Sequence, residues 1–286
     1  MPKLYVVATS IGNLSDLSPR ALETLGAVRL IAAEDTRVTG GLLRHFGIRT
    51  PMTSLHRHNE PGKASGIVAR MLGEGMDVAL VTDAGTPAIS DPGHLLVRAA
   101  WEAGVEVLAV AGPSAVAAAL CISGFDAREF AFYGFLPREK GDLRKKLLDI
   151  IKGPAVAVAY ESPHRVAALV EAVNETLPGC GVCACCDLTK LHEKTLRGSA
   201  AEVLDALQSN PKAEKGEYCV VLDLTHAEKP TEPARRTAGL EAQLFDDMLS
   251  GMDSQAAVEA AVQRGARRND AKRAALRVKG MLERER

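Results

Sequence analysis

Short apolar runs that end in loops of small and polar residues recur along the first part of the chain. Three of them are Leu4–Ala8, Val78–Val81 and Val105–Val110. Runs of Val, Leu and Ala without polar alternation are typical of strands buried on both faces. Helical patterns lie between them, and one opens with Ser18 as N-cap and Pro19 at the first helical position. Strands that alternate with helices in this way predict a mostly parallel, doubly wound α/β sheet.

The second half of the chain repeats this pattern less cleanly. Strands are expected at Pro154–Tyr160, Val182–Cys186 and Tyr218–Leu224, and a helix is expected at Val166–Val173. A chain of 286 residues exceeds the usual size of one hydrophobic core. A second α/β domain is therefore predicted.

The sequence predicts that the chain consists of three segments. A helix that ends at Gly124 separates two α/β domains, at residues 1–124 and 125–225, and a ligand cleft is expected between them. From 226 to about 237 the sequence turns polar, as in a linker, and helical spacing follows. Residues 226–286 are therefore expected to form a linker and a basic helical extension.

The loop Thr82–Gly93, with the sequence TDAGTPAISDPG, follows one of the predicted buried strands. Sheets made of such strands bind ligands beyond the carboxyl ends of the strands, which places Asp83 and Asp91 at the rim of a binding site. Gly85 and Gly93 allow the backbone to approach a ligand closely or to adopt positive φ. The alternative is a tight surface turn, since Asp, Gly, Pro and Thr are ordinary turn residues.

Overall composition excludes few classes of function. The net charge of −1 gives no global sign of a nucleic-acid partner, and 47% hydrophobic with 25% charged residues is ordinary for a globular protein. No apolar stretch is long enough to cross a bilayer, and the N-terminal run MPKLYVV is too short for a signal peptide. We therefore expect a cytoplasmic protein with no membrane partner.

Positive charge collects near the end of the chain, against only a few acidic residues. The basic residues there are Arg264, Arg267, Arg268, Lys272, Arg273, Arg277, Lys279, Arg284 and Arg286. Such a surface either binds RNA phosphates or is the solvated face of a helix, and the sequence leaves both alternatives open.

Four of the six cysteines cluster, at Cys180, Cys183, Cys185 and Cys186. A zinc site would need a second pair of ligands, and the nearest histidine, His192, has no partner at a recognisable spacing. We therefore expect no metal. The alternative to a metal site is a strand in which cysteine is a small buried hydrophobe.

Five short motifs give the chain a resemblance to a known family. They are EDTR (Glu34–Arg37), DAGTP (Asp83–Pro87), ISDPG (Ile89–Gly93), GFLP (Gly134–Pro137) and ESPHR (Glu161–Arg165). Each motif alone is weak, but their combination in this order is specific. From Leu4 to about Leu224 the chain resembles the bacterial ribosomal RNA small subunit methyltransferase I family, within the tetrapyrrole methylase superfamily.

The chain departs from the family pattern at a few positions. Ser10 stands where proline is usual in the first loop, and Ala111 replaces the first proline of a PGPSA pattern. Cys186 and Asp187 replace an arginine and a glutamate, which removes a cation and shortens a carboxylate. The role of those two positions is therefore open.

The resemblance implies a fold, an activity and partners. The fold is a tetrapyrrole-methylase-like pair of α/β domains with a ligand cleft between them and a small helical C-terminal extension. The activity is S-adenosylmethionine-dependent 2′-O-methylation of a cytidine in the decoding centre of 16S ribosomal RNA, on the RNA or the small ribosomal subunit, by a homodimer. Residues expected to bind the methyl donor are Asp83, Ala84, Gly85, Pro87, Ile89, Ser114, Ala115, Tyr160, Leu188 and Thr189.

Methyl transfer from a sulfonium to a ribose hydroxyl is an in-line displacement, so the protein must align the reacting atoms, exclude water and help remove a proton. The candidate catalytic residues are Glu34, Asp35, Arg37, Glu161 and Lys190, with His164 as a less favoured base. The carboxylates are candidate bases, whereas the cations, with Arg165, would bind phosphates or stabilise negative charge. For each of these ions the alternative is a structural ion pair.

Two rival functions remain open. Within the superfamily, the chain would methylate a tetrapyrrole precursor, although its first loop lacks the glycine-rich form typical of those enzymes. From another class, it would be a catalytically silent RNA-binding protein that retains the fold.

Overall fold

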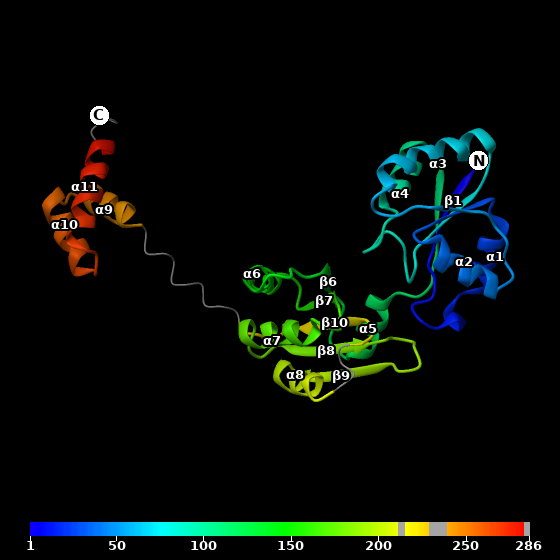
Figure 1. The fold of residues 1–286 in the computed structure, drawn as a ribbon. Coiled ribbons are helices and arrows are strands. Elements are labelled where there is room, and N and C mark those ends of the chain that lie inside the picture. Colours follow the sequence, from blue (N-terminus) through cyan, green and yellow to red (C-terminus); the bar gives the residue numbers. More distant parts are fainter. Residues whose placement is uncertain (211–214, 229–238, 283–286) are drawn as a thin grey trace. The chain divides into compact units, whose positions relative to one another are not determined.

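The computed structural model describes residues 1–210, 215–228 and 239–282 (Figure 1). The chain divides into two compact units, residues 1–228 and 229–286. The first unit holds two five-stranded sheets and the second is helical. Within the described ranges, no helix is long and apolar enough to cross a membrane.

The first sheet is entirely parallel, with the strand order β3-β2-β4-β1-β5. Its strands are β1 (Lys3–Val7), β2 (Leu30–Ala33), β3 (Met52–Ser54), β4 (Val78–Val81) and β5 (Glu106–Val110). The helices of this half are α1 (Pro19–Ala27), α2 (Thr36–His45), α3 (Glu60–Glu74), α4 (His94–Glu102) and α5 (Ala115–Ser123), with a short 3-10 turn η1 (Leu14–Asp16). The predicted doubly wound parallel sheet is confirmed.

Successive side chains along the strands of this sheet pack alternately into two separate hydrophobic cores, one on each face. On β4, Val78 and Leu80 pack with α3 and α4, while Ala79 and Val81 pack with α1 and α2. Successive side chains of a strand point to opposite faces, so a strand covered on both sides needs an unbroken apolar run. The start of α1 also follows the prediction, since the Ser18 side chain accepts a hydrogen bond from the backbone of Ala21 at 3.1 Å.

Glu60 fixes the far end of the Thr82–Gly93 loop. This carboxylate is buried, and its Oε1 accepts backbone hydrogen bonds from Gly93 (3.0 Å), Leu95 (2.7 Å) and Leu96 (3.2 Å). These N–H groups open α4 and have no partner within the helix, so the side chain at the start of α3 caps α4. The loop is thereby held at its end by a charge-assisted contact.

The second sheet is mixed, with the strand order β6-β7-β10-β8-β9. Its strands are β6 (Phe130–Phe135), β7 (Val156–Glu161), β8 (Gly181–Cys186), β9 (Lys194–Ser199) and β10 (Tyr218–Asp223), and its helices are α6 (Lys140–Ile150), α7 (Val166–Thr176) and α8 (Ala200–Gln208). The expectation that this half repeats the parallel architecture is wrong. Only the pairing of β6 with β7 is parallel, because the last strand, β10, inserts antiparallel between β7 and β8, and β9 pairs antiparallel with β8.

The two sheets are joined through α5. This helix follows the first sheet, ends at Gly124 as predicted (φ 66°), and packs Val116, Ala119 and Leu120 against β7, β8 and β10 of the second sheet. Helices α6, α7 and α8 share the core of the opposite face. The predicted domain boundary at 124 and 125 stays a prediction.

Cys183, Cys185 and Cys186 of the cysteine cluster lie in strand β8, as one of the two interpretations expected, and Cys180 directly precedes it. Cys183 and Cys185 are fully buried with their sulfur atoms 3.7 Å apart, and burial raises the pKa of Cys180 to about 12. Among the described residues, no three His, Cys, Asp or Glu side chains are grouped so that they could hold a metal ion. That no metal is required stays a prediction.

In the part of the second unit that the structure describes, residues 239–282, three helices pack into a bundle. Its helices are α9 (Leu240–Leu249), α10 (Ser254–Gln263) and α11 (Arg268–Leu282). Leu244 packs with Ala257, Val258 and the alanine-rich face of α11 to form a small core. The helical extension is confirmed, whereas most of the predicted linker, residues 229–237, lies outside the described residues.

Candidate functional site

A cavity of about 490 Å³ lies within residues 1–228, where loops of the first sheet meet strand ends of the second. Its lining residues are Ile11, Glu34, Asp83, Ala84, Gly85, Thr86, Ile89, Ser90, Asp91, Ser114, Ala115, Phe135, Tyr160, Glu161, Ser162, Pro163, Leu188, Glu217, Tyr218 and Cys219. This volume falls in the range that holds a small organic ligand. The first-sheet residues follow β1, β2, β4 and β5, at the carboxyl ends where ligands bind to parallel sheets.

The carboxylates of Glu34, Asp83 and Asp91 lie on the first-sheet side of the cavity, and we call them the acidic wall. Asp83 accepts a hydrogen bond from the backbone of Asp35 at 3.1 Å, and Glu34 accepts one from the backbone of Asp83 at 3.5 Å. Burial raises the pKa of Glu34, Asp83 and Asp91, and repulsion from neighbouring carboxylates, which for Asp83 is that of Asp35, adds to the shift. The acidic wall is therefore suited to a positively charged ligand, which would relieve both costs.

Glu161 places a buried carboxylate on the second-sheet side. Its Oε1 accepts a hydrogen bond from the backbone of Ser162 at 2.7 Å and lies 3.3 Å from Nη1 of Arg165. Its Oε2 is buried and has no hydrogen-bond partner among the described residues. A buried oxygen without a partner is costly, so this atom is available for a donor from a bound ligand.

Aromatic rings also lie on the second-sheet side of the cavity. The centroid of Tyr160 lies 4.9 Å from that of Phe132 and 5.8 Å from that of Phe135, both in edge-to-face geometry. Burial raises the pKa of Tyr160 to about 12, so its phenol stays neutral near pH 7. Of these rings, Phe135 and Tyr160 line the cavity, and we call these two the aromatic wall.

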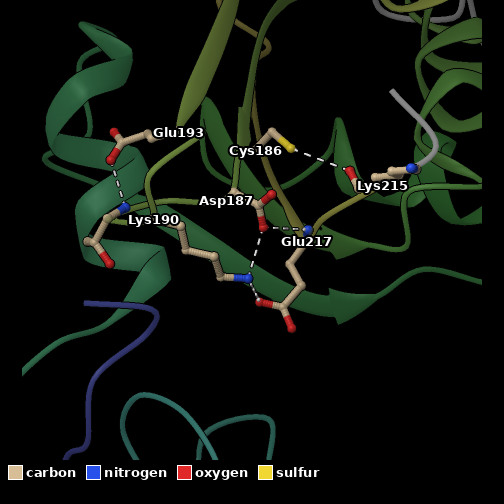
Figure 2. A network of polar contacts seen from close by, with 7 residues as sticks. Cys186, Asp187, Lys190, Glu193, Lys215 and Glu217 are labelled. Atoms are coloured by element: carbon tan, nitrogen blue, oxygen red, sulfur yellow. Dashed lines mark hydrogen bonds and ion pairs between the residues drawn. The ribbon is translucent and has the colours of Figure 1, made fainter. Parts of the chain in front are cut away.

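Lys190 lies in a network of ion pairs beside the cavity (Figure 2). Its Nζ donates to Oδ1 of Asp187 at 2.8 Å and to Oε2 of Glu217 at 2.9 Å, while the backbone of Glu217 donates to Asp187 at 3.3 Å. Two carboxylates therefore face its single charge. Asp187, which departs from the family pattern, is the centre of this network.

The backbone of the loop after β8 is strained. Asp187 and Thr189 have φ values of 50° and 67°, and such values are rare for residues other than glycine, above all for β-branched threonine. Between them, Leu188 lines the cavity. Strained backbone of this kind clusters at functional sites, where the surroundings hold it in place.

Comparison with known proteins places the chain in a family. The sequence pattern of the family described as Tetrapyrrole (Corrin/Porphyrin) Methylases matches residues 3–204. The chain belongs to the tetrapyrrole methylase family. It is 43% identical over 220 residues to ribosomal RNA small subunit methyltransferase I of Xylella fastidiosa, covering 77% of this chain and 80% of that protein. The protein of the same name from Escherichia coli O157:H7 is 41% identical over 249 residues, covering 85% and 86%.

Solved structures show the tetrapyrrole methylase fold at much lower identity. The methyltransferase CobJ has a TM-score of 0.57 at 17% identity, covering 78% of this chain and 94% of that chain. Uroporphyrin-III C-methyl transferase from Thermus thermophilus, complexed with S-adenyl homocysteine, has a TM-score of 0.53 at 15% identity, covering 78% and 97%. The family, the α/β fold class and the methyltransferase class predicted from the sequence are thus confirmed.

Most residues predicted for the site of this tetrapyrrole methylase line the cavity. They are Glu34, Asp83, Ala84, Gly85, Ile89, Ser114, Ala115, Tyr160, Glu161 and Leu188. Pro87 and Thr189 lie in the same loops but are not among the lining residues, and the roles assigned to all of them stay predictions.

Asp35, Arg37 and Lys190 do not line the cavity. Asp35 is the N-cap of α2, and its Oδ2 forms an ion pair with Nη2 of Arg37 at 2.6 Å. The hydrogen bonds from Arg37 hold the pKa of Asp35 at about 2. A carboxylate with so low a pKa is a poor general base near neutral pH.

Sequence reasoning missed several lining residues. They are Ile11, Thr86, Ser90, Phe135, Ser162, Pro163, Glu217, Tyr218 and Cys219, whereas Asp91, expected at the rim of a binding site, does line the cavity. Thr86, Ser90, Phe135, Ser162 and Pro163 stand within the family motifs, which could have indicated them. Those of β10 carry no such signal, since they reach the cavity only through the antiparallel insertion of that strand.

Proposed function

We propose that this chain uses S-adenosylmethionine to methylate the ribose 2′-hydroxyl of a cytidine in the decoding centre of 16S ribosomal RNA. The named relatives support ribosomal RNA as the substrate class. The observation that carries the proposal is the cavity itself, with the acidic wall on one side and, on the other, Oε2 of Glu161, which no described residue contacts through a hydrogen bond. A cationic donor and a hydroxyl acceptor would each meet a matching group.

The acidic wall would hold the donor. S-adenosylmethionine supplies, when bound, a methyl group on a positively charged sulfonium, and it also carries an ammonium group. Asp83, Glu34 and Asp91 would accept its hydrogen bonds and balance its charge. Ser114 caps α5 through its hydroxyl, and the first N–H groups of that helix would receive the donor's carboxylate or adenine.

Glu161 would act on the acceptor. In this proposal its Oε2 accepts the hydrogen bond of the ribose 2′-hydroxyl and takes the proton as the oxygen becomes a nucleophile. Arg165 and the backbone of Ser162 hold the other oxygen, so the orientation of the carboxylate is fixed before the substrate binds. The rings of the aromatic wall would exclude water around it.

The helical unit would bind RNA through exposed basic residues. Arg264, Arg273 and Arg277 form ion pairs with Asp247, Asp270 and Glu241. Exposed basic residues for which no ion pair is present among the described residues are Arg267, Arg268 and Lys272. These three are the candidates for phosphate contacts. The homodimer and the cytoplasmic location stay predictions.

Methyl transfer to purified substrates tests the proposed function. The full chain is incubated with methyl-labelled S-adenosylmethionine and either small ribosomal subunits that lack the modification or a tetrapyrrole precursor. We expect label in 16S RNA only. Label in the tetrapyrrole would support that rival function, and RNA binding without label in either substrate would support a silent RNA-binding protein.

A further inference from the structure

Phe135 owes its position to an irregularity in strand β6. The register pairs Phe132 with Val158 and Phe135 with Tyr160, so three steps on β6 match two steps on β7. Gly134, with φ 62°, supplies the left-handed residue that such a bulge uses. Residues three apart on a regular strand point to opposite faces, but here Phe132 and Phe135 both contact the ring of Tyr160.

The bulge turns a large apolar ring toward the cavity and leaves it uncovered. Phe135 is 63% exposed although it lines the cavity, and on the first-sheet side Ile89 is 56% exposed in the same cavity. Bulges beside functional sites commonly re-aim a side chain in this way. An aromatic face kept in a cavity, with a second ring bracing its edge, suits a flat ligand that stacks on it.

Two flat groups would enter the site of an RNA methyltransferase, namely the adenine of the donor and the base of the target nucleotide. The acidic wall, which suits the positive charge of the donor, comes from the first sheet. Phe135 instead pairs with Tyr160, the residue before Glu161, on strands about 4.8 Å apart. One nucleotide could therefore place its ribose hydroxyl at Glu161 and its base over Phe135.

We propose that Phe135 is the platform on which the base of the target nucleotide stacks when its ribose reaches Glu161. This inference rests on the proposed function. Proteins hold splayed-out RNA bases by stacking them on aromatic side chains, and enzymes that modify a nucleotide commonly extrude it from its neighbours. Stacking accepts any base face, so Phe135 supplies binding and orientation rather than the choice of cytidine.

Variants of two phenylalanines on one strand test the platform. F135A removes the ring, F135L keeps apolar volume without a flat face, and F135W restores an aromatic face. F130A is the matched control, because Phe130 is 44% exposed on the same strand but does not line the cavity. All are assayed as full chains for methylation of small ribosomal subunits at saturating donor and for donor affinity by calorimetry.

For F135A and F135L we expect kcat/KM for the subunits to fall about tenfold to a hundredfold, the usual loss of one stacked base. F135W and F130A should stay within about threefold of the original chain, and donor affinity should be unchanged in all four. Full activity of F135A would overturn the platform. Donor affinity that falls in step with activity would assign the ring to adenine instead.

Two further outcomes separate this inference from other accounts. If F135A changes the oligomeric state by light scattering while F130A does not, Phe135 belongs to an interface between copies of the chain and the platform is overturned. If the original chain methylates no RNA, the proposed function itself fails, and this is recognised because F135W and F130A then show the same absence of label.

Discussion

The wall of the cavity that the first sheet builds carries charge, whereas the wall that the second sheet builds carries rings and one buried carboxylate. Glu34, Asp83 and Asp91 all line the cavity, and burial raises the pKa of each of them. Across from them, Oε2 of Glu161 lies buried in the same cavity as Phe135 and Tyr160 and has no hydrogen-bond partner within the described part of the chain. The acidic wall would be stabilised by a positive charge, and Oε2 of Glu161 would be stabilised by a hydrogen-bond donor. The two sides of the cavity are therefore suited to different ligands.

The largest effect should come from the second wall. E161Q removes the negative oxygen that would take the proton, and the rate of a single turnover should fall by about 100-fold to 10,000-fold, the usual contribution of a general base. Donor affinity by calorimetry should be unchanged, because Glu161 is assigned to the acceptor. E171Q, on the exposed part of α7, is the control. An E161Q chain with normal rates would exclude Glu161 as the base.

The next effect should come from the acidic wall. D83N replaces a charge-assisted contact by a weaker neutral one, and the donor should bind about tenfold to a hundredfold more weakly, as expected for losing about 1.5–3 kcal/mol. The affinity for small ribosomal subunits should not change. D126N, in an exposed ion pair with Arg128, is the matched control. Equal donor affinity in D83N and the original chain, with both folded, would remove Asp83 from the donor site.

A third prediction concerns the helical unit, which belongs to neither wall. The triple variant R267A, R268A and K272A should bind ribosomal subunits with a less steep salt dependence, by up to about 0.9 in slope for each phosphate that is no longer neutralised. Donor affinity should stay the same. R273A and R277A are the controls, because both arginines already form ion pairs. An unchanged slope in the triple variant would make this face a solvated helix surface.

The smallest effect is on stability. Because the pKa values of Glu34, Asp83 and Asp91 are raised above 4.5, 3.8 and 3.8, the folded chain holds these protons more tightly than the unfolded chain. The free energy of unfolding should therefore fall slightly as the pH rises through the raised values, because these groups are partly exposed and solvent screens their interactions. Urea unfolding from pH 4 to 7 should show this fall in the original chain and a smaller fall in the variant E34Q D83N D91N. Parallel curves would contradict it.

The acidic wall could be predicted from the sequence, because unbroken apolar runs such as Val78–Val81 identify strands covered on both faces, and the residues that follow them lie at the ligand-binding edge. The directions of the strands in the second sheet could not be predicted from the sequence. A buried strand such as Tyr218–Asp223 has the same apolar pattern in either direction, so its insertion between β7 and β8 leaves no trace in the sequence.

The same limit explains the outcome for single residues. Lys190 was expected near the chemistry, but Glu217, which reaches it only in the folded chain, occupies one side of its ammonium group. Phe135 was not expected in the site, because its position depends on a bulge at Gly134 that side-chain alternation does not predict. Which side chains line the second-sheet side of the cavity is determined by pairings between distant segments and by local breaks in strand register.

The central claim is that the two walls serve two ligands in one methyl transfer to ribose. The most direct test is mass spectrometry of nucleosides from 16S RNA treated with the full chain and S-adenosylmethionine, with donor affinity measured in parallel for E161Q. The account predicts 2′-O-methylcytidine with the original chain, almost none with E161Q, and equal donor affinity in both. A methyl group on the base, or an E161Q chain that has lost the donor, would contradict it.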